Sequence, residues 1–266
     1  MPRRQRTFDR LRRRVRSALV AIVLRVLIVA LGRLSWTSVQ SFGRGLGALG
    51  WRLARRERRR ALDHLALALP EIGEAERRRL ARSCFHHHGM NLAECLHLLA
   101  RPPAEVARHV EVAGWEEVER LRGEGRPILL LTAHLGNWEL LGPVVAARGV
   151  RLWAVVRGLD DPVLGEVLTR LRRHFGSQVI ERGSRGAARQ LLEALRGGGA
   201  LCMLIDQDTQ VEGVWVPFFG RDAYTPVGAA KLALRRGAAV VPAFLERLPD
   251  GSHRARFLPP LDLPAD

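Results

Sequence analysis

Cysteine is scarce in this chain of 266 residues, which holds only Cys84, Cys95 and Cys202. They stand far apart and form no C-x-x-C pair, so a fold stapled by disulfides is excluded. All three lie among apolar residues, where an unpaired cysteine usually packs as a small hydrophobic side chain. The sequence therefore predicts a protein of a reducing compartment whose cysteines belong to the core.

Acidic residues are almost missing from the first sixty positions, which contain seventeen arginines but only two acidic residues, Asp9 and Glu57. This segment carries +15 of the formal net charge of +16, so the rest of the chain is nearly neutral. A neutral body of this length with many apolar residues buries a sizeable core, which excludes intrinsic disorder. The confinement of the charge to one segment also argues against a protein that binds nucleic acid over its whole surface.

The apolar run Ser17–Gly32 is too short for a simple membrane-spanning helix. As a helix it would reach about 24 Å, short of the ~30 Å hydrocarbon core, and Arg25 interrupts it. An interfacial or partly inserted anchor fits better, with its flanking arginines on anionic headgroups and this end of the chain in the cytoplasm. A cleaved signal peptide would need an A-x-A cleavage pattern, and a nucleic-acid arm would need aromatic stacking residues.

Two patterns in the first hundred residues look like functional motifs but have simpler explanations. The letters G-x-G-x-x-G at Gly45–Gly50 have no strand before them and no acidic residue at the required distance, so close helix or membrane packing explains them better. His86-His87-His88 falls in a helical region over residues 58–99 that breaks at Pro70. Consecutive helix positions point about 100° apart, so these histidines cannot share one ion, and we expect no metal and no cofactor.

Beyond Glu111, short apolar runs alternate with helical stretches. The expected buried strands are Pro127–Thr132, Leu152–Val156, Gln178–Ile180, Ala200–Ile205, Val214–Val216 and Ala239–Leu245. The expected helices are Asn137–Ala147, Pro162–Phe175, Ser184–Leu195 and Val227–Arg236. This alternation predicts an α/β fold with a mixed, mostly parallel sheet flanked by helices. We expect two parts: a basic arm and membrane-anchoring helical segment over residues 1–57, and an α/β domain over residues 58–266.

Polar side chains follow two of these strands, at the carboxyl ends where functional groups of such sheets gather. His134-Leu-Gly-Asn-Trp-Glu139 follows the first strand, and Asp206-Gln207-Asp208 follows the fourth. Gly136 permits a close approach of the chain, and Asn137 can cap the next helix. An isolated H-x4-E is more often a packing histidine and a surface glutamate. Here the strand before it and the helix after it favour a site in which Glu139 holds the His134 imidazole in one tautomer.

The sequence lacks a protein nucleophile to accompany this histidine: no G-x-S-x-G occurs, and no cysteine pairs with His134. A histidine and a carboxylate alone suit deprotonation of a substrate hydroxyl that attacks an activated acyl group, with general-base help worth about 10²–10⁴-fold. The helix N-terminus after Gly136 offers N–H groups to a developing oxyanion. Together with the apolar, basic arm, this chemistry predicts that the hydroxyl belongs to a lipid.

Several short motifs, taken in order, resemble those of a known family. They are His134–Glu139, Ala154–Arg157, Asp206–Asp208, Val216–Gly220, Thr225-Pro226 and Leu232–Pro242. The set resembles the late acyltransferases of lipid A biosynthesis, the lauroyl and myristoyl transferases, within the H-x4-D/E glycerolipid acyltransferase superfamily. The resemblance covers essentially the whole chain. It implies a glycerol-3-phosphate acyltransferase-like fold and a place at the cytoplasmic face of the bacterial inner membrane.

The resemblance also implies roles for individual residues. His134 is expected to be the general base and Glu139 its orienting partner. Arg157 is expected to bind a phosphate or fix the acceptor, with an ordinary strand-end ion pair as the alternative. The other substrate-binding residues expected in the crevice are Asp206, Gln207, Asn137 and Gly136, and Pro217–Gly220 is expected to shape an acyl-chain channel or to pack the core.

The expected function is a membrane-bound O-acyltransferase that moves a fatty acyl chain from an acyl thioester to a hydroxyl of a lipid A precursor. The resemblance makes acyl carrier protein the expected donor, and no nucleic acid is expected as a partner. The alternatives are the same chemistry on a lysophospholipid or another glycolipid, and a non-catalytic membrane-anchored lipid-binding protein of the same fold. Family members continue into further C-terminal helices, whereas this sequence stops soon after a strand expected around Arg254–Leu258.

Overall fold

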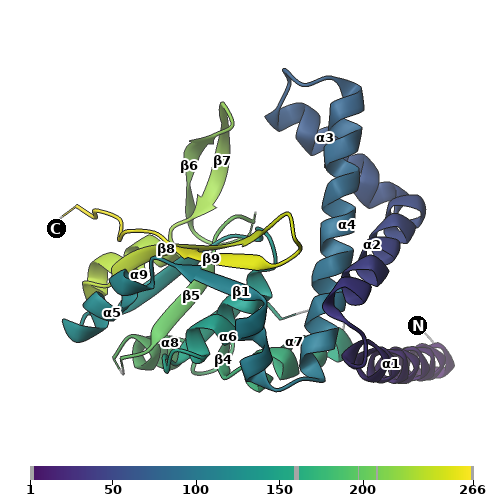
Figure 1. Ribbon diagram of the computed structural model, residues 1–266, viewed down its shortest axis with the longest axis horizontal. Helices are drawn as coiled ribbons and strands as arrows, with labels where there is room; N and C mark the ends of the chain where they lie inside the picture. The colour runs from purple at the N-terminus through teal and green to yellow at the C-terminus, as the bar shows by residue number, and fades with distance from the viewer. Residues whose placement is uncertain (1–2, 159–161, 197, 208, 265–266) are drawn as a thin grey trace.

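The computed structural model describes residues 3–158, 162–196, 198–207 and 209–264, and Figure 1 shows a group of long helices beside a layered α/β body. The helical group consists of α1 (Arg3–Gly32), α2 (Trp36–Leu53), α3 (Arg55–Ala68) and α4 (Glu74–Leu99). The break predicted at Pro70 lies between α3 and α4. The helical region expected over residues 58–99 is therefore confirmed.

A seven-stranded sheet forms the centre of the body, in the order β1-β9-β8-β2-β5-β3-β4. Its strands are β1 (Val110–Ala113), β2 (Ile128–Thr132), β3 (Leu152–Val156), β4 (Ser177–Glu181), β5 (Ala200–Leu204), β8 (Ala239–Arg247) and β9 (His253–Phe257). All neighbouring pairs are parallel except β8 and β9. The mixed, mostly parallel sheet predicted from the sequence is confirmed, although β1 was not among the expected strands.

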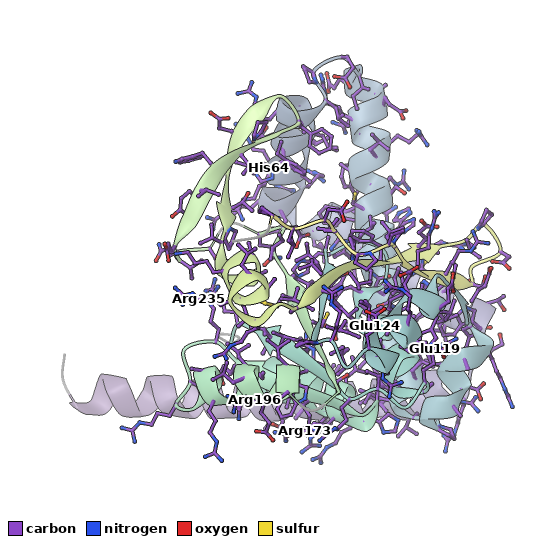
Figure 2. The ribbon with its side chains drawn as sticks, turned by 90° about the vertical axis from the view of Figure 1, so that its left-hand side faces the viewer. His64, Glu119, Glu124, Arg173, Arg196 and Arg235 are labelled. Atoms are coloured by element: carbon purple, nitrogen blue, oxygen red, sulfur yellow. The ribbon has the colours of Figure 1, made fainter. Side chains whose placement is uncertain are left out.

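Helices cover both faces of the sheet because its central strands are apolar on both sides. In β2, Ile128 and Leu130 belong to one buried cluster while Leu129 belongs to the other. The first cluster packs under α5 (Trp115–Gly123), α6 (Leu141–Ala146) and α7 (Pro162–His174), with the 3₁₀ turn η1 (Pro103–Arg108) at its edge. The second packs under α8 (Ala187–Arg196) and α9 (Gly228–Arg236). Arg173 of α7 and Arg196 of α8, both labelled in Figure 2, are exposed on these helices.

A separate antiparallel hairpin projects from the body, formed by β6 (Gly213–Phe218) and β7 (Arg221–Pro226) (Figure 1). The prediction of a buried strand at Val214–Val216 was wrong about burial, because among the described strands β6 pairs with β7 alone and stays outside the central sheet. Val214 is 50% exposed and Trp215 is 68% exposed. Phe218 and Phe219 are also exposed at its tip, so Pro217–Gly220 neither packs the core nor lines the cavity described below.

Helix α1 is longer than the predicted apolar segment because its backbone stays helical from Arg3 onward. Its C-terminal end packs into a cluster with α2 and α4, in which Leu31 and Val39 are buried. Apolar side chains farther up the helix, such as Ile22 and Val26, are exposed. Within the described residues, no helix combines the length and the apolar character needed to cross a membrane. The anchoring role of this segment stays a prediction.

Close packing of α2 on α4 explains one glycine of the Gly45–Gly50 stretch. Gly47 lies so close to α4 that a Cβ atom there would be 2.3 Å from the Phe85 carbonyl oxygen. From the other helix, a Cβ atom on Gly89 would be 2.6 Å from the backbone nitrogen of Gly47. The packing interpretation is therefore confirmed for Gly47 but not for Gly45, which has no atom within 4 Å of a Cβ position, and the stretch lies within a helix rather than in a nucleotide-binding loop. This packing does not test the domain division at residue 57, which stays a prediction.

Candidate active site

His134 lies in the loop that leaves β2, and its imidazole contacts the carboxylate of Asp206, which follows β5. Nδ1 of His134 lies 2.8 Å from Oδ1 of Asp206, and the backbone N–H of His134 donates to Oδ2 at 2.8 Å. The two strands are adjacent and parallel, so their carboxyl ends bring these residues together. An ionised carboxylate can only accept, so the imidazole carries its proton on Nδ1 and leaves the lone pair of Nε2 free.

Two further side chains fix the His134 ring. The indole of Trp138 meets it edge to face, with ring centroids 4.8 Å apart. The amide of Gln207 lies 3.4 Å from Nε2, a distance too long for a strong hydrogen bond. Within the described residues, Nε2 therefore accepts only this long and weak hydrogen bond, which a substrate hydroxyl can replace.

Glu139 does not hold His134, which corrects the expectation from the H-x4-E spacing. Its carboxylate forms a two-pronged ion pair with the guanidinium of Arg172 in α7, with Nε 3.0 Å from Oε2. The chain after Gly136 forms a 3₁₀ turn, η2 (Trp138–Leu140), rather than the first turn of a regular helix. Glu139 is consequently turned toward α7, and Asp206 takes the position beside the imidazole.

Gly136 and Asn137 anchor the loop from behind. Gly136 has a φ of 59°, and a Cβ atom there would lie 1.9 Å from the Leu245 carbonyl oxygen, so the close approach predicted for it is confirmed. Asn137 is 1% exposed, and its side chain does not cap the following turn. Its amide instead donates to Oε2 of Glu94 at 2.8 Å, while Asn91 donates to the Gly136 carbonyl. Both residues therefore support the loop, and the substrate contact expected of them stays a prediction.

Glu94 is the centre of a buried polar network that the sequence reasoning missed. It is fully buried in α4 and accepts hydrogen bonds from Gln40 of α2, Arg247 of β8 and His253 of β9, in addition to Asn137. Burial by itself would raise the pKa of Glu94, but the hydrogen bonds from His253 and Arg247 outweigh it and lower the pKa to about 2. A glutamate inside the apolar stretch Met90–Leu99 was the available signal, because an unpaired charge is not stable there.

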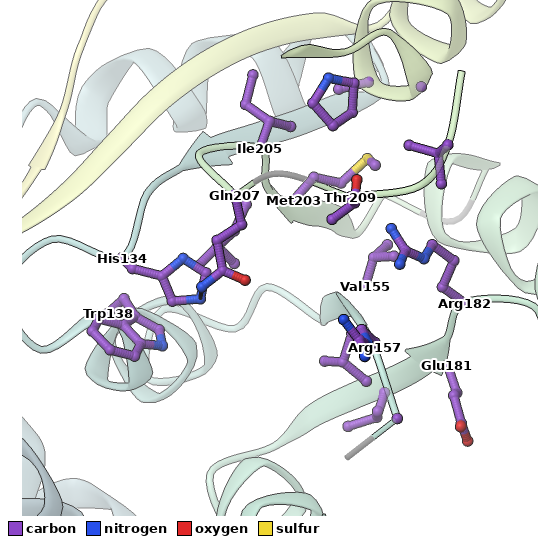
Figure 3. A pocket seen from close by; sticks show the side chains of 18 of the residues that line it. His134, Trp138, Val155, Arg157, Glu181, Arg182, Met203, Ile205, Gln207 and Thr209 are labelled. Atoms are coloured by element: carbon purple, nitrogen blue, oxygen red, sulfur yellow. Dashed lines mark hydrogen bonds between the residues drawn. The ribbon is translucent and has the colours of Figure 1, made fainter. Parts of the chain in front are cut away.

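A cavity of about 900 Å³ opens beside His134. Figure 3 shows His134, Trp138 and Gln207 along one side of it and Arg157, Glu181 and Arg182 along the other. Its apolar walls come from strands β3, β4 and β5 and from α7 and include Val155, Val179, Met203, Ile205 and Leu168. The cavity therefore joins a long apolar surface to a rim of charged groups.

Arg157 follows β3 and lines this cavity with an exposed side chain. Within the described residues it has no ion pair, unlike Lys231 on the same cavity, which pairs with Glu212. Among the described residues nothing supports the alternative of an ordinary strand-end ion pair for Arg157, and the anion-binding role expected of it stays a prediction. Asp208, the last residue of the Asp206–Asp208 motif, lies outside the described residues.

The cysteines do not offer a nucleophile to this site. Burial raises the pKa of Cys202 to about 12 and that of Cys95 well above its ordinary value, so both stay protonated thiols in the core. Cys84 is exposed on α4, which corrects the expectation that all three cysteines are buried. In the part of the chain that is described, no group of histidine, cysteine and acidic side chains has the arrangement of a metal site.

Comparison with known proteins identifies the family of the chain. The model of one family, described as bacterial lipid A biosynthesis acyltransferase, matches residues 1–266. The chain belongs to this family. It is therefore an acyltransferase, and the resemblance inferred from the sequence motifs is confirmed.

Individual members of the family and related enzymes are moderately similar to the chain. The lipid A biosynthesis lauroyltransferase of Escherichia coli K12 is 29% identical over 231 residues, which cover 86% of this chain and 74% of that protein. The myristoyltransferase of the same organism is 29% identical over 82% of this chain and 67% of its own length. A phosphatidylinositol mannoside acyltransferase of Mycobacterium tuberculosis is 30% identical over 142 residues, 52% of this chain and 45% of its own.

Proposed function

We propose that this acyltransferase transfers a fatty acyl chain from an acyl thioester to a hydroxyl group of a lipid A precursor. The observation that carries the proposal is the His134–Asp206 pair, whose imidazole lines the cavity and whose Nε2 has only a weak contact with Gln207, another residue that lines the cavity. The names of the two Escherichia coli relatives supply the substrate class. The donor is acyl carrier protein carrying the acyl group, a choice that rests on the family resemblance.

The reaction follows from the positions of these groups. Nε2 of His134 accepts the proton of the acceptor hydroxyl while Nδ1–H donates to Asp206, which stabilises the imidazolium as it forms. The acceptor oxygen attacks the thioester carbonyl carbon, and a tetrahedral intermediate forms. As the C–S bond breaks, the imidazolium returns its proton to the departing thiolate. The new ester and a free thiol leave, and His134 is neutral again.

The cavity provides a place for each part of the substrates. The apolar walls around Val155, Val179 and Met203 accommodate the acyl chain, and the guanidinium of Arg157 binds a phosphate of the acceptor. Glu139 stays paired with Arg172 and fixes α7 against the loop that carries His134. In this proposal Glu139 is a positioning residue, because it shapes the site without taking the proton.

A second acceptor class deserves the same test. The mycobacterial relative that matches half of this chain is named for a phosphatidylinositol mannoside, which is also a glycolipid. The proposed location is the cytoplasmic face of the bacterial inner membrane, where a lipid acceptor and a soluble acyl carrier meet. The exposed apolar side chains of α1, together with the arginine-rich start of the sequence, support membrane attachment.

The proposal is tested by acyl transfer with purified protein. Wild type and His134→Ala receive radiolabelled acyl chains on acyl carrier protein, and products on a lipid A precursor, a phosphatidylinositol mannoside and a lysophospholipid are identified by mass spectrometry. We expect the substitution to lower the rate at least about 10²-fold because the general base is lost.

The matched control is His64→Ala, which removes an exposed histidine of α3 and should leave the rate unchanged. Undiminished transfer by His134→Ala would contradict the assignment of His134 as the general base. The acceptor that gives the highest rate decides between lipid A precursors and other glycolipids.

A further inference from the structure

The β6–β7 hairpin presents aromatic side chains to solvent, and such exposed apolar groups often mark an interaction site. At its tip Phe218 is 63% exposed and Phe219 is 56% exposed, and Trp215, farther along β6, is 68% exposed. The hairpin forms its own two-stranded sheet and projects from the body (Figure 1). Its aromatic residues do not line the cavity beside His134, so the proposed reaction leaves them without a role.

The backbone at the tip places Phe219 in a conformation that suits a smaller residue better than an aromatic one. Phe218 pairs with Arg221, so Phe219 and Gly220 form a two-residue turn. Both have positive φ angles, 50° and 69°. Turns of this kind prefer asparagine followed by glycine, because a bulky side chain is strained at a positive φ. A phenylalanine that is both strained and exposed indicates that the aromatic group itself is used there.

A basic helix lies on the same side of the body as the hairpin. Helix α3, which carries His64, and the hairpin both rise on that side in Figures 1 and 2. Just before α3, at the end of α2, Leu53 is 71% exposed. Four exposed arginines of α3 make no ion pair within the described part of the chain: Arg55, Arg56, Arg59 and Arg60.

We propose that the tip of the β6–β7 hairpin inserts into the headgroup region of an anionic lipid bilayer, with the arginines of α3 on the phosphates beside it. Aromatic side chains favour the interface between headgroups and acyl chains, and arginines add electrostatic attraction to anionic lipids. A narrow projecting tip suits insertion between lipids better than docking of a folded protein, which needs a broader surface. The inference rests on the proposed function in one respect, because a lipid acceptor would be located in a membrane.

A fluorescent label at the tip tests the insertion directly. Cys84→Ser removes the exposed thiol, and Phe219→Cys in the same full-length chain then carries an environment-sensitive fluorophore, because Cys95 and Cys202 are buried. We expect its emission to shift to the blue on addition of phosphatidylglycerol vesicles and much less with phosphatidylcholine vesicles. The control label at Leu261→Cys, a position 47% exposed in the C-terminal segment, should not shift.

A second variant separates lipid binding from folding. Phe218→Ser combined with Phe219→Asn gives the turn the asparagine-glycine pair that it prefers, so thermal unfolding should stay close to wild type. We expect its partition onto phosphatidylglycerol vesicles to fall about tenfold, because two aromatic side chains no longer leave water.

The outcomes are distinguishable from those of the proposed function. Unchanged partition of the double variant, or a label at position 219 that responds to acyl carrier protein but not to vesicles, overturns the insertion. Transfer by the wild type to a detergent-dispersed acceptor is measured in parallel. Its absence contradicts the proposed function and leaves the result with vesicles intact.

Discussion

Two carboxylates near His134 have different partners, although both are close to it in the fold. Asp206 uses one oxygen for the imidazole and the other for the backbone N–H of His134. Glu139 uses both oxygens for Arg172. The first arrangement sets the tautomer of the general base, and the second fixes the position of a helix. Substitutions at the two positions should therefore affect catalysis in different ways.

We expect Asp206→Asn to lower kcat by about 10²–10⁴-fold with little change in KM, because an amide does not stabilise the imidazolium and also permits the wrong tautomer. Glu139→Gln removes the charge that pairs with Arg172 and should weaken the site by loosening α7, with a larger effect on KM and on thermal stability. Steady-state kinetics and thermal unfolding of both variants check this. A larger loss of kcat in Glu139→Gln than in Asp206→Asn would return the orienting role to Glu139.

The sequence predicted where these residues gather but not which of them would pair. The rule that functional groups stand at the carboxyl ends of parallel strands brought His134 and Asp206 to one edge of the sheet. The choice of Glu139 assumed a regular helix after Gly136. A 3₁₀ turn forms there instead, and Arg172, distant in sequence, competes for the carboxylate. Neither fact can be read from local spacing.

The contact between α2 and α4 depends on glycines at particular positions of one helix. Gly43 and Gly47 are buried against α4, whereas Gly45 has no atom within 4 Å of where a side chain would start. The same helix thus contains a position that tolerates no side chain and a position that does. This difference provides a matched pair of substitutions.

We expect Gly47→Ala to lower the free energy of unfolding by about 1–3 kcal/mol, because its Cβ would meet backbone atoms of Phe85 and His86 that cannot move aside cheaply. Gly45→Ala should raise stability by up to about 1 kcal/mol, since alanine favours the helix and meets nothing. Chemical denaturation of the two variants measures both. Equal effects at positions 45 and 47 would contradict the close contact.

Most strands of the central sheet were predictable because they are apolar and bounded by turns, but the four-residue β1, which contains Glu111, was not. The hairpin β6–β7 was not, because Val214–Phe219 is as apolar as a core strand and gives no sign that it is exposed. Strand β7 carries Arg221, Asp222 and Thr225 and has no apolar run to mark it. The pattern of apolar residues alone does not distinguish a residue that is buried in the protein core from an apolar residue that is exposed at the surface.

The network around Glu94 joins parts of the chain that are distant in sequence. Its members come from α2, α4, the loop after His134, β8 and β9. Because a glutamate with a lowered pKa binds its proton less readily in the folded state, it stabilises the fold fully above its ordinary pKa of 4.5. This stabilisation is lost as the pH falls from there toward about 2.

We expect Glu94→Gln to lower the free energy of unfolding by about 3 kcal/mol at neutral pH, because Arg247 is left buried without its counter-charge. The variant should also lose less stability than wild type between pH 4.5 and about 2. Chemical denaturation across this range measures both effects. The control is Glu246→Gln on the same strand as Arg247, whose exposed pair with Arg256 should contribute less than about 1 kcal/mol. Parallel pH profiles of wild type and Glu94→Gln would contradict the assignment.

The same network makes the loop of His134 depend on strands that are distant from it in sequence. Gln40 and Glu94 belong to α2 and α4, whereas Arg247 and His253 come from β8 and β9. A fragment without β8 and β9 would leave Glu94 without its cationic partners and would weaken the support that reaches the loop through Asn137. Such a fragment would keep both His134 and Asp206, yet it would hold them less firmly.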